Sequence, residues 1–384
     1  MRETWVAGAA TNRYGKMAET GREAGSRVAL EAIRSAGLEP KEIDLTFVAN
    51  AFGIAEHQAH VGPLVNTALG IPEVPSATIE SACSSSSAAL HEAYVHVAGG
   101  FADAVLVVGF EKLSHLDTLA ATSYFAIGAD YPYEAHNGAT FPGLYALMAN
   151  AHAQRYGTSE AELGAVAVKN HANGALNPHA HFQKPISPEI YRASPVVASP
   201  LRLYDCCPFS DGAAAVVVTA RERFPHPAAE PLVVRASVRA GSIGDIQDRS
   251  TLTALPATRR AAERAFRTAG IEAGRIGFFE VHDCFTIAEL IALEDLGLFP
   301  PGAAGRATVD GITAHDGAHP VNPSGGLKAK GHPVSATGVG QVVEIFEQVN
   351  QRAGGRQVPR TETALAHNVG ATGSSCSVHI FGRR

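Results

Sequence analysis

The segment Ala29–Glu39, ALEAIRSAGLE, recurs in register much later in the chain as Ala262–Glu272, AERAFRTAGIE. Each copy carries apolar residues at helical spacing, followed by a glycine that can end a helix. The similarity continues into the strand-like segment behind each copy, where Val48 corresponds to Val281. Chance similarity of two alanine-rich helices would not extend into the next strand. The repeat therefore predicts two similar α/β halves.

Length and composition are typical of a globular protein with a large core. The chain has 384 residues, of which 46% are hydrophobic and 18% are charged, enough for two or three domains. A net charge of −6 argues against nucleic-acid binding by bulk charge. No apolar run is long enough to span a membrane, and the first residues do not resemble a signal peptide. Five cysteines do not form a disulfide framework, so we expect a cytoplasmic protein with reduced thiols.

The predicted elements divide the chain into residues 1–222 and residues 223–384. In the first half, residues 113–205 differ in composition from the alternating helices and strands around them. Glycine, proline, histidine and tyrosine become frequent there. Such a segment is typical of a long insertion that covers a site. A linker with proline and glutamate, residues 221–231, separates the halves. The strands and helices predicted from periodicity are strands 5–10, 45–52, 103–109, 212–218 and 377–381 and helices 20–36, 143–156, 160–174 and 340–349.

A cysteine stands at the start of another predicted helix in the first half. In Ser81–Leu90, SACSSSSAAL, Cys83 lies among small residues just before apolar residues at helical spacing. A thiol in the first turn of a helix feels the positive end of the helix dipole, which favours the thiolate. The alternative is a structural cysteine, since most free cysteines are buried and inert. Cys83 is thus a candidate nucleophile.

The second half contains three further stretches with chemically active side chains. Glu280–Thr286, EVHDCFT, follows a predicted strand, and the carboxyl ends of strands are favoured places for functional groups in open α/β sheets. Asn322–Gly338 is a glycine-rich loop that contains His332 and opens into a helix. His367–Gly373, HNVGATG, is a predicted loop before the closing strand.

Together these stretches resemble the thiolase superfamily, and most closely its sterol-carrier-protein-2 type. The resemblance rests on four motifs in order: the loop at Cys83, the HDCF stretch at His282, the Gly-His-Pro stretch at His332, and the His-Asn-x-Gly stretch at Asn368. It covers nearly the whole chain. It implies a thiolase fold of two βαβαβαββ halves in a five-layer αβαβα arrangement, in which the Cys83 helix is central and residues 113–205 form an inserted loop domain.

The same resemblance implies an acyl-CoA thiolase, an acyltransferase that makes or breaks the carbon–carbon bond of a 3-ketoacyl-CoA. Cys83 would carry the acyl group, because a thioester exchanges readily with a thiol. His332 would accept the proton of Cys83 or stabilise its thiolate. The second acid/base would be Cys284 of the HDCF stretch, since the last-loop cysteine of most thiolases is replaced here by Asn368.

Two oxyanion holes are also implied by the resemblance. His282 and His332 would hold the oxygen of the enolate or thioester, while the backbone N–H groups of Cys83 and Gly370 would bind the tetrahedral intermediate. Structural alternatives exist for each side chain: a strand-end cap for His282, a core position for Cys284 and a turn for His332. The last loop is also less glycine-rich than in many relatives, which leaves the shape of the acyl pocket open.

Cofactors, partners and other functions follow from the same comparison. The resemblance implies coenzyme A as a substrate without a tightly bound cofactor, a role in lipid metabolism, and a homodimer or dimer of dimers. We expect no nucleic-acid or membrane partner. We also expect no metal site, because no histidine of residues 113–205 pairs with carboxylates at ligand spacing. The cysteines at positions 206, 207 and 376 are expected to be structural.

Two alternative functions remain open. A carrier-protein-dependent ketosynthase also uses a cysteine with two histidines, but it should not need Cys284. A partner-dependent thiolase-like protein, such as an aldolase or an acyl-CoA binder, would act beside a small OB-fold protein. Side-chain-cleaving aldolases of this type often lose the thiolase residues, whereas His282, Cys284 and His332 are all present here.

Overall fold

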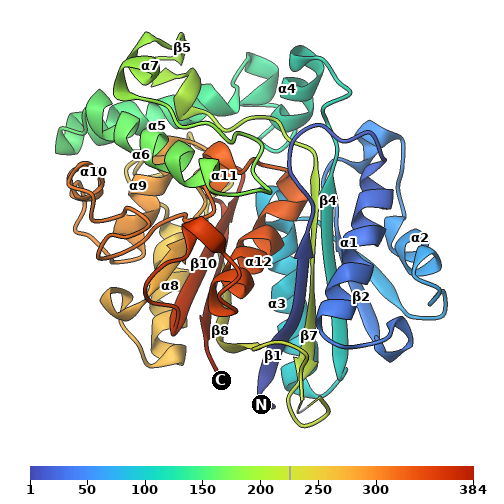
Figure 1. Ribbon diagram of the computed structural model, residues 1–384. Helices are drawn as coiled ribbons and strands as arrows, with labels where there is room; N and C mark the ends of the chain where they lie inside the picture. Colours follow the sequence, from blue (N-terminus) through green and yellow to red (C-terminus); the bar gives the residue numbers. More distant parts are fainter. Residues whose placement is uncertain (225) are drawn as a thin grey trace.

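A computed structural model describes residues 1–224 and 226–384 as a mixed α/β fold, and within them nine strands form one large sheet. The strand order is β3-β2-β4-β7-β1-β8-β11-β10-β9, with helices on both sides of it (Figure 1). The strands are β1 Thr4–Thr11, β2 Leu45–Ala49, β3 Ser76–Ile79, β4 Ala104–Glu111, β7 Gly212–Ala220, β8 Leu232–Gly241, β9 Phe278–Glu280, β10 Thr363–Gly370 and β11 Ser375–Gly382.

The helices form three layers around the two halves of the sheet. The outer layers pack on opposite sides, α1 and α2 against the first-half strands and α8 and α9 against the second-half strands. Between them, α3 and α12 lie against both halves (Figure 1). The predicted five-layer arrangement and the central position of the Cys83 helix are thus confirmed. The helices are α1 Gly21–Ser35, α2 Val61–Ala68, α3 Ser85–Gly99, α8 Pro256–Ala269, α9 Thr286–Asp295 and α12 Thr337–Val349.

The two halves repeat one topology. In the first half the order from the centre outward is β1-β7-β4-β2-β3, and in the second half it is β8-β11-β10-β9. The fifth strand of the second half is reduced to a parallel bridge between Phe279 and Val321. Strands β1 and β8 join the halves through the pairs Trp5–Val233 and Val6–Leu232. The repeated helix and strand therefore reflect a duplicated unit.

The predicted insertion lies across one end of the layers, above α11 and the end of β4 in Figure 1. Its helices begin with side-chain caps, Thr140 on α5 and a capping box of Ser159 and Glu162 on α6. No helix among the described residues is both long and apolar enough to cross a membrane. The elements here are α4 Thr118–Ala126, α5 Phe141–Tyr156, α6 Glu160–Ala175, α7 Pro188–Ala193, β5 Val196–Ala198 and β6 Leu201–Arg202, and the second half adds α10 Ala304–Val309 and α11 Gly326–Ala329.

Three boundaries differ from those expected from periodicity. The strand predicted to reach residue 52 ends at Ala49, because the Asn50 side chain turns to bond with β4. The helix predicted to begin at Cys83 begins at Ser85, after a 3₁₀ turn. The predicted loop at residues 367–373 is strand through Gly370, since that segment pairs with β11. In the predicted linker, residue 225 lies outside the described residues.

Helices α3 and α12 are in close contact. The turn with Cys83 leads into α3, and the loop with His332 leads into α12. A Cβ atom built on Gly338 of α12 would lie 2.7 Å from the backbone nitrogen of Ser87 on α3. The Ser86 hydroxyl accepts a hydrogen bond of 3.1 Å from the Val339 amide at the same crossing. Glycine is therefore required at position 338 by packing.

We expect Gly338→Ala to lower the free energy of unfolding by about 1–3 kcal/mol, because the backbone of α3 must move away. Chemical denaturation followed by circular dichroism measures the effect. Gly274→Ala is the matched control, since a Cβ atom there meets no atom within 4 Å. Equal stability of the two variants would contradict the tight crossing.

Candidate active site

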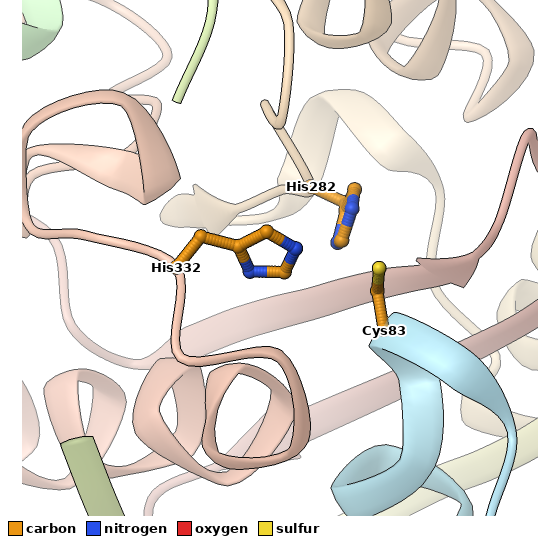
Figure 2. Close-up of side chains that lie close together, drawn as sticks. All are labelled: Cys83, His282 and His332. Carbon is orange, nitrogen blue, oxygen red and sulfur yellow. The ribbon is translucent and has the colours of Figure 1, made fainter. Parts of the chain in front are cut away.

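The side chains of Cys83, His282 and His332 converge at one place between the halves. The Cys83 sulfur and one ring nitrogen of each histidine all lie within 4.8 Å of one another. Figure 2 shows the three side chains pointing toward a shared space from three separate segments. Both histidines are buried, whereas Cys83 is partly accessible. Three of the four residues predicted as catalytic are thus brought together.

Each of these side chains is held at the end of a regular element. Cys83 lies in the 3₁₀ turn before α3, and Ala82 before it has a left-handed φ of 47°. That conformation is unfavourable for alanine and persists only where the surroundings enforce it. His282 follows β9 by two residues, and His332 lies in the loop between α11 and α12.

The hydrogen bonds of His332 determine which ring nitrogen carries its proton. The Thr337 hydroxyl donates its single proton to the Pro333 carbonyl over 2.9 Å. It must therefore accept the 2.7 Å hydrogen bond from Nδ1–H of His332. Nε2 of His332 has no partner among the described side chains and is buried. It presents a lone pair to the site, as a general base requires.

His282 has the opposite arrangement. The Asn368 amide Nδ2 lies 2.8 Å from Nδ1 of His282 and donates to it. A neutral imidazole that accepts at Nδ1 carries its proton on Nε2, and this buried nitrogen also has no partner within the described chain. Burial and the neighbouring His332 lower the pKa of His282 well below its usual value, so the ring is neutral. His282 therefore presents an N–H donor to the space where His332 presents an acceptor.

The positions of the protons on the two imidazole rings also decide how well the cluster could bind a metal ion. One sulfur and two imidazole nitrogens at these separations could be ligands of an ion. A metal-bound histidine, however, usually donates its remote N–H to an acceptor, and only His332 does so. Nε2 of His282 carries a proton instead of a free lone pair. The donor set therefore fits acid–base chemistry better than a resident metal.

The electrostatic surroundings of Cys83 differ from the sequence-based expectation. Burial raises the pKa of its thiol to about 12, although hydrogen bonds with the backbone of Ala371 and Cys83 favour the thiolate. The dipole of α3 therefore does not produce a resting thiolate, because desolvation of the charge outweighs it. Burial also lowers the pKa of His332 to about 3. At neutral pH the pair is a neutral thiol beside a neutral imidazole.

The turn after β10 closes the site against the Cys83 loop. A Cβ atom on Gly370 would lie 2.5 Å from the Ser81 carbonyl, so only glycine fits there. Ala371 follows in a left-handed conformation, with φ of 53°, and its backbone hydrogen bonds with the Cys83 sulfur. The turn thus reaches the sulfur one residue later than the predicted contact of Gly370. The oxyanion-hole role of Gly370 stays a prediction.

Cys284 is buried beside the cluster but does not belong to its closest group. Burial raises the pKa of its thiol well above the usual value, with Cys207 and Cys83 adding to this effect and the nearby Tyr145 hydroxyl opposing it. Tyr145 stacks on Phe285 with ring centroids 4.6 Å apart and donates from its hydroxyl to the Ala371 carbonyl. Cys284 therefore stands as a protonated thiol near the nucleophile.

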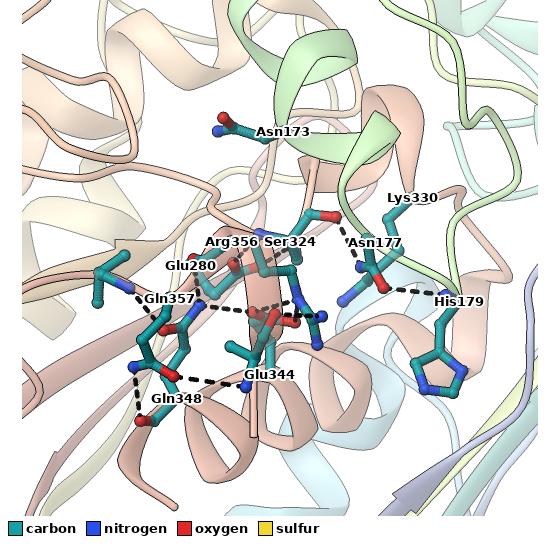
Figure 3. Close-up of polar contacts among 12 residues, drawn as sticks. Asn173, Asn177, His179, Glu280, Ser324, Lys330, Glu344, Gln348, Arg356 and Gln357 are labelled. Atoms are coloured by element: carbon teal, nitrogen blue, oxygen red, sulfur yellow. Dashed lines mark hydrogen bonds and ion pairs between the residues drawn. The ribbon is translucent and has the colours of Figure 1, made fainter. Parts of the chain in front are cut away.

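Buried carboxylates hold the His332 loop against β9. Glu280 accepts from the amide and the hydroxyl of Ser324, at 3.1 and 2.7 Å. Asp283 accepts from the amide of Leu327 at 2.6 Å, at the start of α11. Figure 3 shows the Glu280–Ser324 contacts beside the buried ion pair of Glu344 and Arg356 on the next elements. This clamp fixes His332 relative to His282.

The insertion holds the same loop from the other side. Side-chain amides of α6 and the turn after it donate to the loop: Asn173 to the Asn322 carbonyl at 2.9 Å and Asn177 to the Ser324 carbonyl at 2.8 Å. Asn170 donates to both Asp283 and Glu289. None of these positioning residues was predicted. Isolated carboxylates in apolar segments, such as Glu289 in α9, were the available signal.

Comparison with known protein families identifies the chain. A family described as "Thiolase, N-terminal domain" matches residues 7–222, and one described as "Thiolase C-terminal domain-like" matches residues 240–383. The chain belongs to the thiolase family. The resemblance drawn from the four motifs, and with it an acyltransferase enzyme, is thereby confirmed.

Named relatives support this assignment over the full length. An acetyl-CoA acetyltransferase from Methanothermobacter thermautotrophicus is 40% identical and is covered completely, as is this chain. Sterol carrier protein 2 from Bos taurus is 32% identical over 80% of this chain and 59% of its own length. The structure titled "Ltp2-ChsH2(DUF35) aldolase" shares the fold with a TM-score of 0.85 at 23% identity, covering 99% of this chain and 98% of its own.

The neutral state of the Cys83–His332 pair makes a test possible. Because the pKa of Cys83 is raised to about 12, the rate of its alkylation by iodoacetamide should rise about tenfold per pH unit between about pH 7 and 10. Mass spectrometry of the Cys83 peptide measures the rate, with Cys83→Ala as the background. A plateau within that range would reveal a resting thiolate and contradict the neutral pair.

Proposed function

We propose that this protein is an acyl-CoA thiolase that cleaves or forms 3-ketoacyl-CoA through an acyl group on Cys83. One observation carries the proposal: two buried imidazoles face the same sulfur, one with an acceptor nitrogen at His332 and one with an N–H donor at His282. Acyl transfer through a thiol needs a base for the nucleophile and a donor for the oxygen that becomes negative. The two tautomers supply these two groups.

In cleavage, Nε2 of His332 takes the proton of Cys83 as the sulfur attacks the keto carbon. The carbon–carbon bond then breaks, and the electron pair moves into the enolate of acetyl-CoA while the acyl group stays on Cys83 as a thioester. Nε2–H of His282 is placed to hydrogen bond with the enolate oxygen. Nothing in this step requires a thiolate before substrate binds, which agrees with the raised pKa of Cys83.

Cys284 completes the proton transfers. Its buried, protonated thiol gives a proton to the α-carbon of the enolate, which releases acetyl-CoA. The resulting thiolate removes the proton of an incoming coenzyme A thiol, whose sulfur attacks the acyl-Cys83 thioester. Cys83 leaves as a thiolate and recovers its proton from His332. The reverse order of these steps gives the condensation.

Coenzyme A thioesters are the proposed substrates, without a tightly bound cofactor, and a role in lipid metabolism follows from them. Acetyl-CoA acetyltransferases from two methanogens are similar over almost the whole chain, and a relative named benzoylsuccinyl-CoA thiolase subunit BbsB is 32% identical over 98% of it. The names support acyl-CoA chemistry without fixing the acyl chain. All five cysteines are free, which supports the proposed reducing, cytoplasmic location.

We propose two kinds of assembly, a complex with a small partner protein and a homodimer or dimer of dimers. The name of the "Ltp2-ChsH2(DUF35) aldolase" structure includes a second component, which favours a small partner protein as an alternative mode of action. The edge strand β3 pairs on one side only, and Ala77 and Thr78 on it are exposed, which favours a homodimer or dimer of dimers. A structural relative at 18% identity is described as monomeric, so size-exclusion chromatography with light scattering decides the state.

Formation of the acyl-enzyme tests the proposed function. Wild-type protein incubated with acetyl-CoA should gain one acetyl group on Cys83, detected by mass spectrometry, and should cleave acetoacetyl-CoA when coenzyme A is present. Cys284→Ser should still form acetyl-Cys83, at a reduced rate because Cys284 also protonates the departing coenzyme A thiolate, and should lose roughly 10²-fold or more in cleavage. A ketosynthase would be nearly insensitive to that change. Cleavage of acetoacetyl-CoA without acetylation of Cys83 would rule out the proposed route.

The tautomer of His282 can be tested by changing its partner. Asn368→Asp replaces the amide donor with an acceptor, which places the His282 proton on Nδ1 and removes the donor from the site. We expect kcat for acetoacetyl-CoA cleavage to fall by about 10²–10³-fold, with acetylation of Cys83 much less affected. Asn137→Asp, an exposed amide in the insertion, is the control. An unchanged kcat would contradict the donor role of His282.

A further inference from the structure

A cavity of about 340 Å³ lies beside the site, between α6, the turn after it and the segment that precedes β7. This volume falls within the range of small-molecule sites in proteins. Most of the wall is apolar or aromatic, and three basic side chains also line it. The lining residues that matter here are His171, Phe182, Lys184, Tyr204, Cys207 and Lys328.

Two of the basic side chains are buried with fewer hydrogen-bond partners than they have donors. Lys328 is 1% exposed, and its Nζ donates to the Cys206 carbonyl. Within the described residues no carboxylate lies within 4 Å of it, whereas the guanidinium of Arg356, which is also buried, is paired with Glu344. The ring nitrogens of His171, 3% exposed, make no well-formed hydrogen bond in the described chain, where the backbone of Lys184 is a weak contact. Burial of unpaired polar groups costs free energy unless a ligand or water satisfies them.

The donors of Lys328 and His171 suit a bound anion, whereas a cation would be repelled by the charge of Lys328. Burial and the charge of Lys328 lower the pKa of His171 to about 4, so the ring is neutral and offers one N–H. Lys328 has three N–H groups and uses one for Cys206. Phe182 and Tyr204 pack against the His171 ring with centroids 5.7 and 5.4 Å away, which fixes its orientation.

The cavity lies next to two of the segments that carry the site, the stretch of Cys284 and the segment that leads to His332. Cys207 donates from its amide to the Cys284 carbonyl at 2.9 Å, so the two residues face each other across a short antiparallel bridge. Phe209 forms a second bridge with His332. Lys328 itself lies in α11, just before the loop that carries His332, and its amide donates to Asp283. A group bound here would lie against the backbone pair that joins Cys207 to Cys284.

We propose that this cavity binds an anionic group of the thioester substrate, carboxylate or phosphate oxygens, through the ammonium of Lys328 with the N–H of His171 as a second donor. The inference rests on the proposed thiolase function and adds a substrate class to it. Two sources share this chemistry: a carboxylate at the end of the acyl chain and a phosphate of coenzyme A. Charge-assisted hydrogen bonds in a buried cavity are strong enough to select either one.

Three thioesters separate the two sources. Succinyl-CoA carries a terminal carboxylate, butyryl-CoA is the uncharged match, and butyryl-pantetheine lacks all phosphates. The rate of Cys83 acylation is measured for each by mass spectrometry, with wild-type protein and with Lys328→Met. Lys328→Gln is a second variant in case the first fails to fold, and thermal unfolding monitors both. Lys41→Met, an exposed lysine outside the cavity, is the control.

If the acyl chain supplies the anion, wild-type protein should prefer succinyl-CoA to butyryl-CoA by roughly tenfold or more, and Lys328→Met should abolish that preference. If coenzyme A supplies it, Lys328→Met should reduce a similar preference for butyryl-CoA over butyryl-pantetheine. An equal loss with all three thioesters, or no change with any, would overturn the proposal. Failure of every thioester to acylate wild-type Cys83 would instead reject the thiolase function itself.

Discussion

The arrangement of the site depends on carboxylates buried at the end of β9 and just after it. Glu280 and Asp283 stand on either side of His282 and accept hydrogen bonds from the loop that carries His332. Two histidines from distant parts of the chain are thereby held in one geometry by groups that would be costly to leave unpaired. The insertion adds amide donors from α6 to the same loop. The clamp links the covering domain, the second half of the sheet and the catalytic space into one unit.

Burial also sets the protonation states of the catalytic groups. It raises the pKa of Cys83 and Cys284 and lowers the pKa of both histidines, so all four groups are neutral before substrate binds. Neutral groups are inexpensive to bury, whereas a thiolate–imidazolium pair in a dry site would carry a desolvation penalty. Hydrogen bonds at the two Nδ1 atoms then decide which histidine donates and which accepts. Charge needs to develop only when the substrate oxygen and sulfur are present to share it.

In the cavity lined by Lys328, buried donors are available to a group of the substrate. The catalytic cluster has its partners assigned within the chain, apart from the nitrogen atoms that face the reacting groups. Lys328, which uses one of its three N–H groups for the Cys206 carbonyl, and His171 line a cavity beside Cys207, whose amide bonds with the Cys284 carbonyl. Buried donors left without acceptors in one cavity indicate where a ligand completes the structure.

The sequence alone determined the duplicated α/β halves, the inserted segment and the four site motifs, because apolar periodicity, the internal repeat and the types of residues near glycine-rich turns are local properties. It could not place Thr337 behind His332 or Asn368 behind His282, since those contacts depend on how β10, α12 and β9 come together. The helix dipole at Cys83 was visible in the sequence, but the burial that outweighs it was not. Desolvation and tautomers depend on neighbours distant in the chain, and only the tertiary structure supplies these.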